Sequence, residues 1–215
     1  MNSLVSLPIA YLLGSIPTAV WTARIWKGID IREYGSKNAG LTNVFRVLGW
    51  KPALPVVIVD LCKGMLGPWI ALKIAPDQPV IALLAGILTI LGHSFTCLAG
   101  FRGGKGVLTS MGVFLTLSPV ASLLAFSVWV LVTFTSGFVS LGSILACITL
   151  ALLLLSGFLQ WPVIGPWVGE VHPGLLATGV ATAAFVVYKH KANMVRLWNG
   201  TENRFGKRGK KQVTV

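Results

Sequence analysis

The sequence predicts an all-α, polytopic transmembrane helical bundle, and three observations lead to that prediction. Apolar residues make up 54% of the 215 residues and charged residues only 11%, whereas roughly a quarter of a typical soluble domain is charged. Near-continuous apolar stretches recur at lengths that cross a bilayer as helices. Basic residues gather between these stretches. We therefore expect a single integral membrane domain over residues 1–215, with a basic C-terminal segment at 189–215.

The apolar stretches divide into seven predicted membrane spans. These lie at about 4–24, 52–74, 80–98, two short spans within 107–135, then 141–159 and 173–188. The stretch 107–135 exceeds the ~20 residues that cross a bilayer, and Ser118-Pro119 near its middle offers a turn. A five-span alternative keeps that stretch as one helix. The first stretch lacks the basic start and the cleavage site of a signal peptide, so we expect it to be retained as a span.

The basic residues predict the orientation of the bundle. With seven spans, 16 of the 18 Lys and Arg residues fall on one side, and only Lys63, inside a span, and Lys73, on the opposite side, do not. Lys and Arg collect on the cytosolic side of membrane proteins. We therefore expect the N-terminus outside the cell and the basic loops in the cytosol. The five-span alternative keeps the same charge asymmetry.

The first informative loop runs from Gly35 to Arg46 and is dense in hydrogen-bond donors. Its small residues allow the backbone to approach a ligand, so that N–H groups can point at one anion. Arg46 can grip an oxyanion through two nitrogens, and neutral donors come from four further side chains, Ser36, Asn38, Thr42 and Asn43. The alternative interpretation is a membrane-surface loop with ordinary cytosolic charges.

The second loop contains Gly103-Gly104-Lys105-Gly106 directly before a predicted helix. Backbone amides, the helix dipole and the Lys105 ammonium would converge there, which is the arrangement that holds a phosphate. The spacing is not that of a Walker A loop, because Ala99 stands where the first glycine is needed and Gly106 where Ser or Thr is needed. ATP hydrolysis is therefore disfavoured. The alternative interpretation is a glycine hinge with a lysine that reaches to the membrane surface.

The third segment follows the last span. His190, Asn193 and Arg196 are spaced by three and share one helix face. Glu202 is the one acidic residue of the C-terminal segment and is expected to pair with an arginine. His190 has two interpretations, a cation that caps a helix C-terminus or a residue with a role in chemistry.

Two pairs of polar residues lie within or at the ends of spans. Asp60 and Lys63 sit one turn apart inside the second span, where charge is costly unless the two pair or face a polar cavity. A structural ion pair and a site role both remain open for them. Ser140 and Ser143 lie at the start of a span, where helix capping and packing are the alternative to substrate contact.

Taken together, these segments resemble the bacterial membrane glycerol-3-phosphate acyltransferases that use acyl phosphate as donor. The family motif G-S-x-N-x-G-x-T-N-x-x-R is matched from Gly35 to Arg46. A second motif, G-H-x-F-P with F-K-G-G-K-G-V-x-T, is matched by Gly92, His93, Phe95 and Phe101 to Thr109. A third, H-R-x-N-I-x-R-L-x-x-G-x-E-x-K, is matched by His190, Asn193, Arg196, Leu197, Gly200 and Glu202. The departures are Lys37 for the commoner Gly, Thr96 for Pro, Arg102 for Lys, Lys191 for Arg and Arg204 for Lys.

The resemblance implies transfer of a fatty acyl group from acyl phosphate to the sn-1 hydroxyl of glycerol 3-phosphate in the bacterial inner membrane, with the active site facing the cytosol. The product would be 1-acylglycerol 3-phosphate, a precursor of phospholipid. No cofactor, metal or nucleic acid is expected. The residues expected in catalysis are Lys105, His190 and Ser143, and those expected to bind substrate are Ser36, Asn38, Thr42, Asn43, Arg46, His93, Gly103, Gly104, Gly106, Asn193, Arg196 and Glu202.

Acyl phosphate is an activated donor, so direct attack by the glycerol hydroxyl needs no covalent enzyme intermediate. None of the three histidines has an aspartate five residues later, the spacing used by soluble-motif acyltransferases. Either a substrate phosphate oxygen or His190 would take the proton. The competing functional class is a transporter for an organic phosphate, which would need its anion site at mid-membrane. A binding or scaffold protein is a third class, and it leaves the donor-rich loops without a purpose.

Overall fold

The computed structural model describes residues 3–205, and all regular structure in that range is helical. The first half contains η1 (Ser3–Val5), α1 (Ser6–Gly14), α2 (Thr18–Lys27), η2 (Ile31–Glu33), α3 (Leu41–Leu48), α4 (Trp50–Ile74), α5 (Pro79–Ser94), η3 (Cys97–Ala99) and α6 (Val107–Leu117). The second half contains α7 (Pro119–Ser136), α8 (Val139–Phe158), α9 (Gly165–Val168), α10 (Pro173–Lys189) and α11 (Lys191–Trp198). The prediction of an all-α membrane bundle is confirmed.

The chain divides into two compact units, one up to Thr116 and one from Leu117 onward. Each is described here by itself, and the single membrane domain stays a prediction. The last part of the predicted basic C-terminal segment, 206–215, lies outside the described residues.

Five helical stretches are long and apolar enough to cross a membrane: Ser3–Lys27, Trp50–Ile74, Pro79–Ala99, Pro119–Ser136 and Val139–Phe158. Two shorter apolar helices, Val107–Leu117 and Pro173–Lys189, complete the set predicted from the sequence. The predicted break at Ser118-Pro119 is present, because Ser118 is the non-helical N-cap of α7 and Pro119 its first residue. Seven crossings and an external N-terminus stay predictions.

The first apolar stretch is broken in a way that the predicted single helix did not include. It forms α1 and α2, separated by Ser15, Ile16 and Pro17. Pro17 has no backbone N–H and disfavours a helical conformation at Ile16. The break takes the carbonyls of Ser15 and Ile16 out of a regular helical ladder. The Thr18 amide donates to Ile16 at 3.0 Å, and both carbonyls also accept from side chains elsewhere in the sequence, which satisfies them in an apolar environment.

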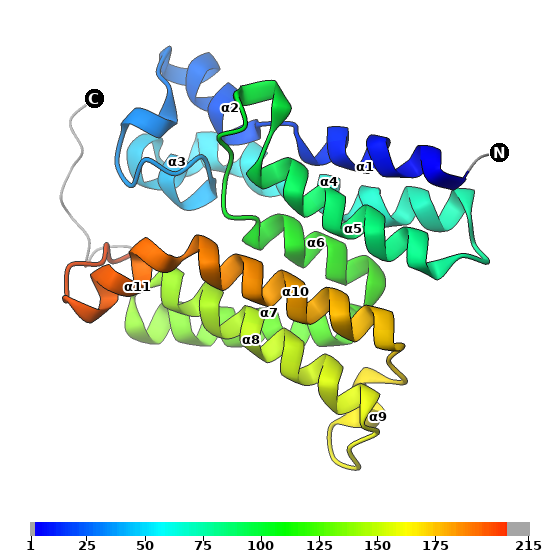
Figure 1. Ribbon diagram of the computed structural model, residues 1–215. Helices are drawn as coiled ribbons and strands as arrows, with labels where there is room; N and C mark the ends of the chain where they lie inside the picture. Colours follow the sequence, from blue (N-terminus) through cyan, green and yellow to red (C-terminus); the bar gives the residue numbers. More distant parts are fainter. Residues whose placement is uncertain (1–2, 206–215) are drawn as a thin grey trace. The chain divides into compact units, whose positions relative to one another are not determined.

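In the first unit, α1, α4 and α5 pack side by side (Figure 1). Glycine permits the closest approach between α1 and α5. A Cβ at Gly14 would lie 2.9 Å from the Cα of Thr89, and one at Gly92 would lie 3.0 Å from the backbone nitrogen of Ser15. Small residues of this kind allow membrane helices to pack backbone to backbone.

The polar loops of the first unit gather at one end. The Ser3 hydroxyl donates to the Gln78 side chain at 3.2 Å, which places the start of α1 beside the α4–α5 turn. The segments with α2 and α3 lie at the opposite end of this unit (Figure 1). The basic residues between α2 and α4 are therefore separated from the α4–α5 turn by the length of the helices.

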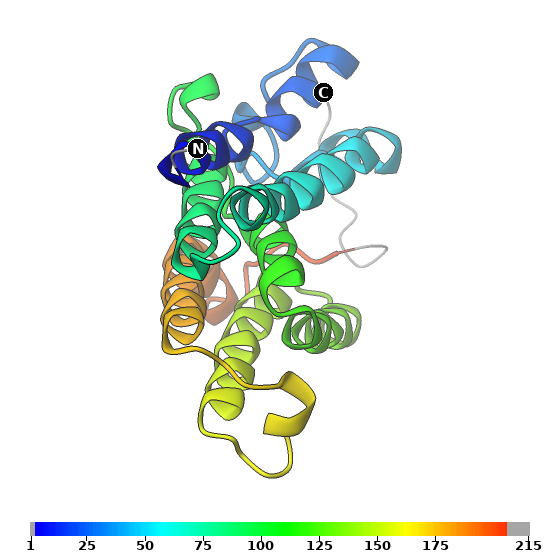
Figure 2. The same ribbon diagram turned by 90° about the vertical axis from the view of Figure 1, so that its right-hand side faces the viewer.

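In the second unit, α8 packs against both α7 and α10 (Figure 2). Gly137 ends α7 in a left-handed conformation with φ of 80°. The chain after α11 returns to this turn, because the Phe205 amide donates to the Gly137 carbonyl at 2.8 Å. The polar residues of the third motif thereby lie next to the start of α8.

Candidate functional site

The first loop is wound around the side chain of Asn43, in the first turn of α3. Asn43 is 1% exposed. Its Nδ2 donates to three backbone carbonyls, those of Ile31, Tyr34 and Asn38, at 2.9–3.1 Å. Its Oδ1 accepts from the Ser36 amide at 2.8 Å. Asn43, predicted to contact substrate, thus uses its amide to hold the shape of the loop.

Two residues of this loop adopt left-handed backbone conformations. Gly35 and Lys37 both have φ of 58°. A Cβ at Gly35 would collide with the Oδ1 of Asn43, so the turn around Asn43 requires glycine there. Lys37 stands where the resembling family commonly has glycine, and its φ explains that preference, since only glycine adopts this region without steric cost.

The remaining predicted ligands of the first loop, Ser36, Asn38, Thr42 and Arg46, are all partly exposed. Thr42 and Arg46 are four residues apart on α3, so they share one face of that helix. These side chains border the loop that Asn43 organises, and they stay candidates for substrate contact.

Arg32 connects the first loop to the second, a role that the sequence interpretation missed. Its Nη1 donates to the Ala99 carbonyl at 2.7 Å and to the Arg102 carbonyl at 3.3 Å. Its Nη2 lies 2.6 Å from the Oδ2 of Asp30. The hydrogen bond from the Arg32 side chain lowers the pKa of Asp30 from 3.8 to about 2, and Asp30 in turn raises the pKa of Arg32.

The second loop folds back on the end of α5. The amides of Gly103 and Gly104 donate to the carbonyls of Ser94 and His93, each at 3.2 Å. A Cβ at Gly103 would collide with the His93 carbonyl, and a Cβ at Gly104 with the His93 ring and, at 2.7 Å, with the carbonyl oxygen of Ala39. Glycine is thus required for close backbone packing at both positions. Because the amides of Gly103 and Gly104 already donate within the protein, Lys105 and Gly106, directly before α6, are the candidates that stay for the predicted phosphate site.

A buried ion pair lies beside the break in the first helix. Lys63 Nζ is 2.8 Å from Asp60 Oδ1, and both residues are 2% exposed. The same Nζ donates to the Ile16 carbonyl at 2.7 Å. The Thr96 hydroxyl donates to the Ser15 carbonyl. Asp60 and Lys63 therefore form an ion pair, and Lys63 supplies a donor to the interrupted helix. A site role for the two stays a prediction.

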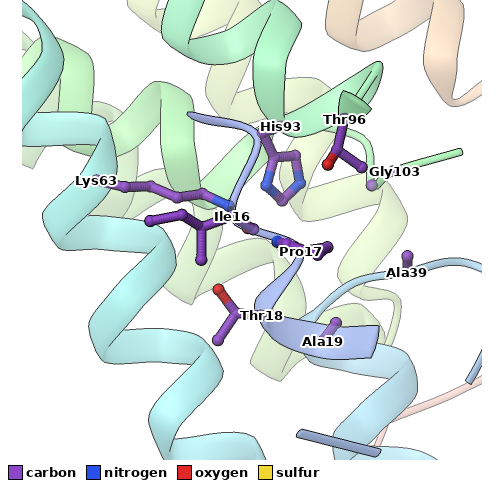
Figure 3. Close-up of a pocket in the computed structure, with 10 residues that line it drawn as sticks. Ile16, Pro17, Thr18, Ala19, Ala39, Lys63, His93, Thr96 and Gly103 are labelled. Carbon is purple, nitrogen blue, oxygen red and sulfur yellow. Dashed lines mark hydrogen bonds between the residues drawn. The ribbon is translucent and has the colours of Figure 1, made fainter. Parts of the chain in front are cut away.

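A small pocket adjoins this pair (Figure 3). His93 reaches it from α5, with its Nδ1 3.8 Å from Asp60 Oδ1. No sequence spacing indicated that Asp60 and His93 would meet, because helix packing brings them together. Three predicted site residues, His93, Gly103 and Gly104, are among those that line the pocket, which are Ile16, Pro17, Thr18, Ala19, Ala39, Lys63, His93, Thr96, Gly103 and Gly104.

In the second unit, Glu202 gathers the third motif. Its Oε2 accepts from Arg196 Nε at 2.7 Å, so the predicted pairing with an arginine is confirmed. Its Oε1 accepts from Asn193 Nδ2 at 2.7 Å and from the Ser140 hydroxyl at 3.0 Å. The Glu202 side chain is 5% exposed. One carboxylate therefore joins α11 to the start of α8.

His190 and Ser143 are both buried in the second unit. His190 Nδ1 lies 2.8 Å from the Val186 carbonyl. A carbonyl can only accept, so Nδ1 carries the proton and Nε2 is the nitrogen of the neutral ring that can accept one. The Ser143 hydroxyl donates to the Val139 carbonyl at 2.8 Å and accepts from Trp129 Nε1 at 3.3 Å, which are contacts of helix packing.

The fold and these loops define an integral membrane protein whose glycine-rich and basic loops lie at one end of its first unit. Residues 4–200 match the sequence model of the family described as glycerol-3-phosphate acyltransferase. Glycerol-3-phosphate acyltransferases of Chlorobaculum parvum and Fusobacterium nucleatum are 43% and 41% identical, over 97% and 92% of this chain and 99% and 95% of theirs.

Two solved structures are similar to this one. They are the glycerol 3-phosphate form and the lysophosphatidic acid form of the integral membrane glycerol 3-phosphate acyltransferase PlsY (YgiH). The first has a TM-score of 0.84 and 35% identity over 96% of both chains, and the second 0.81 and 34% over 97% of this chain and 98% of that chain. The chain belongs to the glycerol-3-phosphate acyltransferase family and is an integral membrane acyltransferase.

The left-handed conformation of Lys37 predicts that Lys37→Gly stabilises the protein. Glycine removes the steric cost at φ of 58° but raises the entropy of the unfolded chain, so the expected net gain is about 0.5–1 kcal/mol. Thermal unfolding in detergent measures it. Lys51→Gly, in the first turn of α4, is the matched control and is expected to destabilise. Equal effects of the two changes would contradict the role given to the backbone.

The Asp30–Arg32 pair predicts a pH-dependent contribution to stability. The pKa of Asp30 falls from 3.8 to about 2 on folding, so the stabilisation is complete above about pH 4 and is lost as the pH falls towards 2. Asp30→Asn removes it. The unfolding temperatures of the wild-type protein and this variant should therefore differ most above pH 4 and converge near pH 2. A constant difference over this range would show that the carboxylate charge contributes nothing.

Proposed function

We propose that this protein transfers a fatty acyl group from acyl phosphate to the sn-1 hydroxyl of glycerol 3-phosphate and releases 1-acylglycerol 3-phosphate (lysophosphatidic acid) and inorganic phosphate. The observation that carries the proposal is the likeness, over 96% of both chains, to a solved acyltransferase in its glycerol 3-phosphate form. The likeness to the lysophosphatidic acid form of the same relative supports the proposed product.

In the proposed reaction, the sn-1 hydroxyl oxygen attacks the acyl carbonyl carbon. The new ester C–O bond forms, the C–O bond to the phosphate breaks, and phosphate leaves with that electron pair. The hydroxyl proton passes to a phosphate oxygen or to His190, whose Nε2 is the accepting nitrogen of the neutral ring. No oxidant, reductant or further reactant is needed.

The first unit supplies the proposed phosphate contacts. Lys105 lies at the start of α6, where its ammonium and the helix dipole both favour an anion. Arg46 on α3 is the bidentate candidate for the phosphate of glycerol 3-phosphate. The two loops that carry these residues are held together by Arg32, which supports a common site for them. The work of these groups is positioning and charge stabilisation.

The proposed location is the bacterial inner membrane, with the site on the cytosolic face. This placement is supported by the charge asymmetry, since 16 of 18 Lys and Arg residues fall on the side of these loops in the seven-span topology. Both proposed substrates carry phosphate, and only the acyl chain favours lipid. A site at the membrane surface suits such a pair.

The decisive assay supplies purified protein with glycerol 3-phosphate and, in parallel, acyl phosphate, acyl-CoA or acyl carrier protein carrying the same chain. We expect product only with acyl phosphate. Use of the thioesters alone would overturn the proposed donor. Robust uptake of glycerol 3-phosphate into proteoliposomes, without acyl transfer, would favour a transporter.

Lys105 gives a second prediction. Lys105→Ala should lower kcat/KM for acyl phosphate about 10²-fold, because one preorganised charged donor is removed. Lys73→Ala is the matched control, because Lys73 lies near the end of α4, over the Trp69 ring at 5.7 Å, and its loss should leave turnover unchanged. Near-normal turnover of Lys105→Ala would exclude the proposed phosphate contact.

A further inference from the structure

We propose that His93 is a positioning residue, a strut between the buried Asp60–Lys63 pair and the backbone at Gly104, which fixes Lys105 in its place. The proposal rests on the proposed role of Lys105 as a phosphate contact. It gives a function to the charged pair inside α4, which the reaction itself does not require.

The inner end of the strut is held by several hydrogen bonds. Asp60 Oδ1 is held by Lys63 Nζ at 2.8 Å and by the Thr18 hydroxyl at 3.1 Å. Lys63 is fixed in turn by the Ile16 carbonyl, at 2.7 Å. Residues from α1–α2 and α4 thus converge on one carboxylate oxygen. A buried charge held by several partners is costly to displace, so Asp60 is a rigid reference point for the side chain next to it.

His93 lies against that reference point. Its Nδ1 is 3.8 Å from Asp60 Oδ1, and the residue is 9% exposed. Figure 3 shows the ring and the Lys63 side chain approaching the Ile16–Pro17 segment from two different helices. Asp60 and Lys63, both from α4, are ionisable groups next to the ring, since Lys63 lines the same pocket as His93.

The outer edge of the ring meets the glycine loop. A Cβ at Gly104 would lie 3.1 Å from His93 Cε1 and would collide with Nε2. The Gly104 amide also donates to the His93 carbonyl at 3.2 Å. Backbone and ring of one residue therefore fix Gly104, and Lys105 is the next residue along the chain. A displacement of about 1 Å at a substrate-positioning group can cost about 10²-fold in rate.

The adjacent glycine provides an internal control. A Cβ at Gly103 would also collide with His93, but with its backbone carbonyl rather than its ring. Changing the side chain at position 93 can therefore relieve the clash of an alanine at 104 with the ring, although the approach to the Ala39 carbonyl oxygen at 2.7 Å stays, and it cannot relieve an alanine at 103. His93→Asn keeps a donor near the Nδ1 position and removes the Cε1–Nε2 edge.

The test is a pair of double-mutant cycles on kcat/KM for the acyl donor. We expect His93→Asn to cost about tenfold and Gly104→Ala about a hundredfold. The double variant should be no worse than Gly104→Ala alone, so that the two changes couple by about tenfold. The effects of Gly103→Ala and His93→Asn should multiply. If the effects of the single changes on kcat/KM multiply in both cycles, the proposal is overturned.

A second measurement separates positioning from proton transfer and from folding. The loss in His93→Asn should appear in KM for the donor, with kcat kept within a few-fold and its pH profile unchanged. A kcat loss of a thousandfold at unchanged KM would make His93 a general base and overturn the proposal. Thermal unfolding of each variant shows whether it is folded.

The cycles are run with whichever donor the wild-type protein uses. If the proposed donor is wrong, the assay of the wild-type protein shows it. The coupling between His93 and Gly104 can still be measured with the donor that the protein does use. Asp60→Asn extends the test from the other end of the strut. It should raise KM for the donor as His93→Asn does, and the two changes together should cost no more than the larger single effect. Independent effects on KM would show that Asp60 and His93 do not act in series.

Discussion

Two backbone carbonyls at the break of the first apolar helix constrain the rest of the first unit. In a membrane, a carbonyl without a donor costs several kcal/mol. The Ile16 carbonyl accepts from the Thr18 amide and from Lys63 Nζ, and the Ser15 carbonyl accepts from the Thr96 hydroxyl. Lys63 can be buried only because Asp60 neutralises it. The Lys63–Ile16 bond therefore draws a charged pair into α4, and that pair places Asp60 next to His93.

Glycine determines how the loop before α6 packs against this network. Gly103 and Gly104 lack the Cβ atoms that would collide with His93, so the loop can return along the end of α5. Arg32 then joins this loop to the one wound around Asn43. The two sequence motifs of the first unit are thus joined through backbone contacts, and Arg46 and Lys105 both lie on segments that these contacts hold.

The helices and the motif-bearing loops were predictable from the sequence because both are local features. Apolar length predicted the spans, and Ser118-Pro119 predicted the helix break that the structure contains. The corresponding break at Ser15–Pro17 was not predicted, because apolar residues continue on both sides of it and apolar length alone defined the span at 4–24. Asn43 shows a different limit. Its side-chain amide predicts hydrogen bonding, but its partners depend on how the chain turns, since one of them is the carbonyl of Ile31, twelve residues earlier.

The approach of His93 to Asp60 follows from helix packing, which spacing along the chain does not encode. In the second unit, the expected partner of Glu202 was an arginine, and Ser140 and Asn193 joined it through tertiary structure.

The broken first helix also sets a requirement on biogenesis. Synthesis proceeds from the N-terminus, so the Ile16 carbonyl leaves the ribosome well before Lys63, which lies on the next apolar helix. Until then the Ile16 carbonyl has only the local Thr18 amide as a donor, at 3.0 Å. The Ser15 carbonyl accepts from Thr96, which is synthesised later still, after α5. The long-range hydrogen bonds at the break are therefore completed only after α4 and α5 have been made.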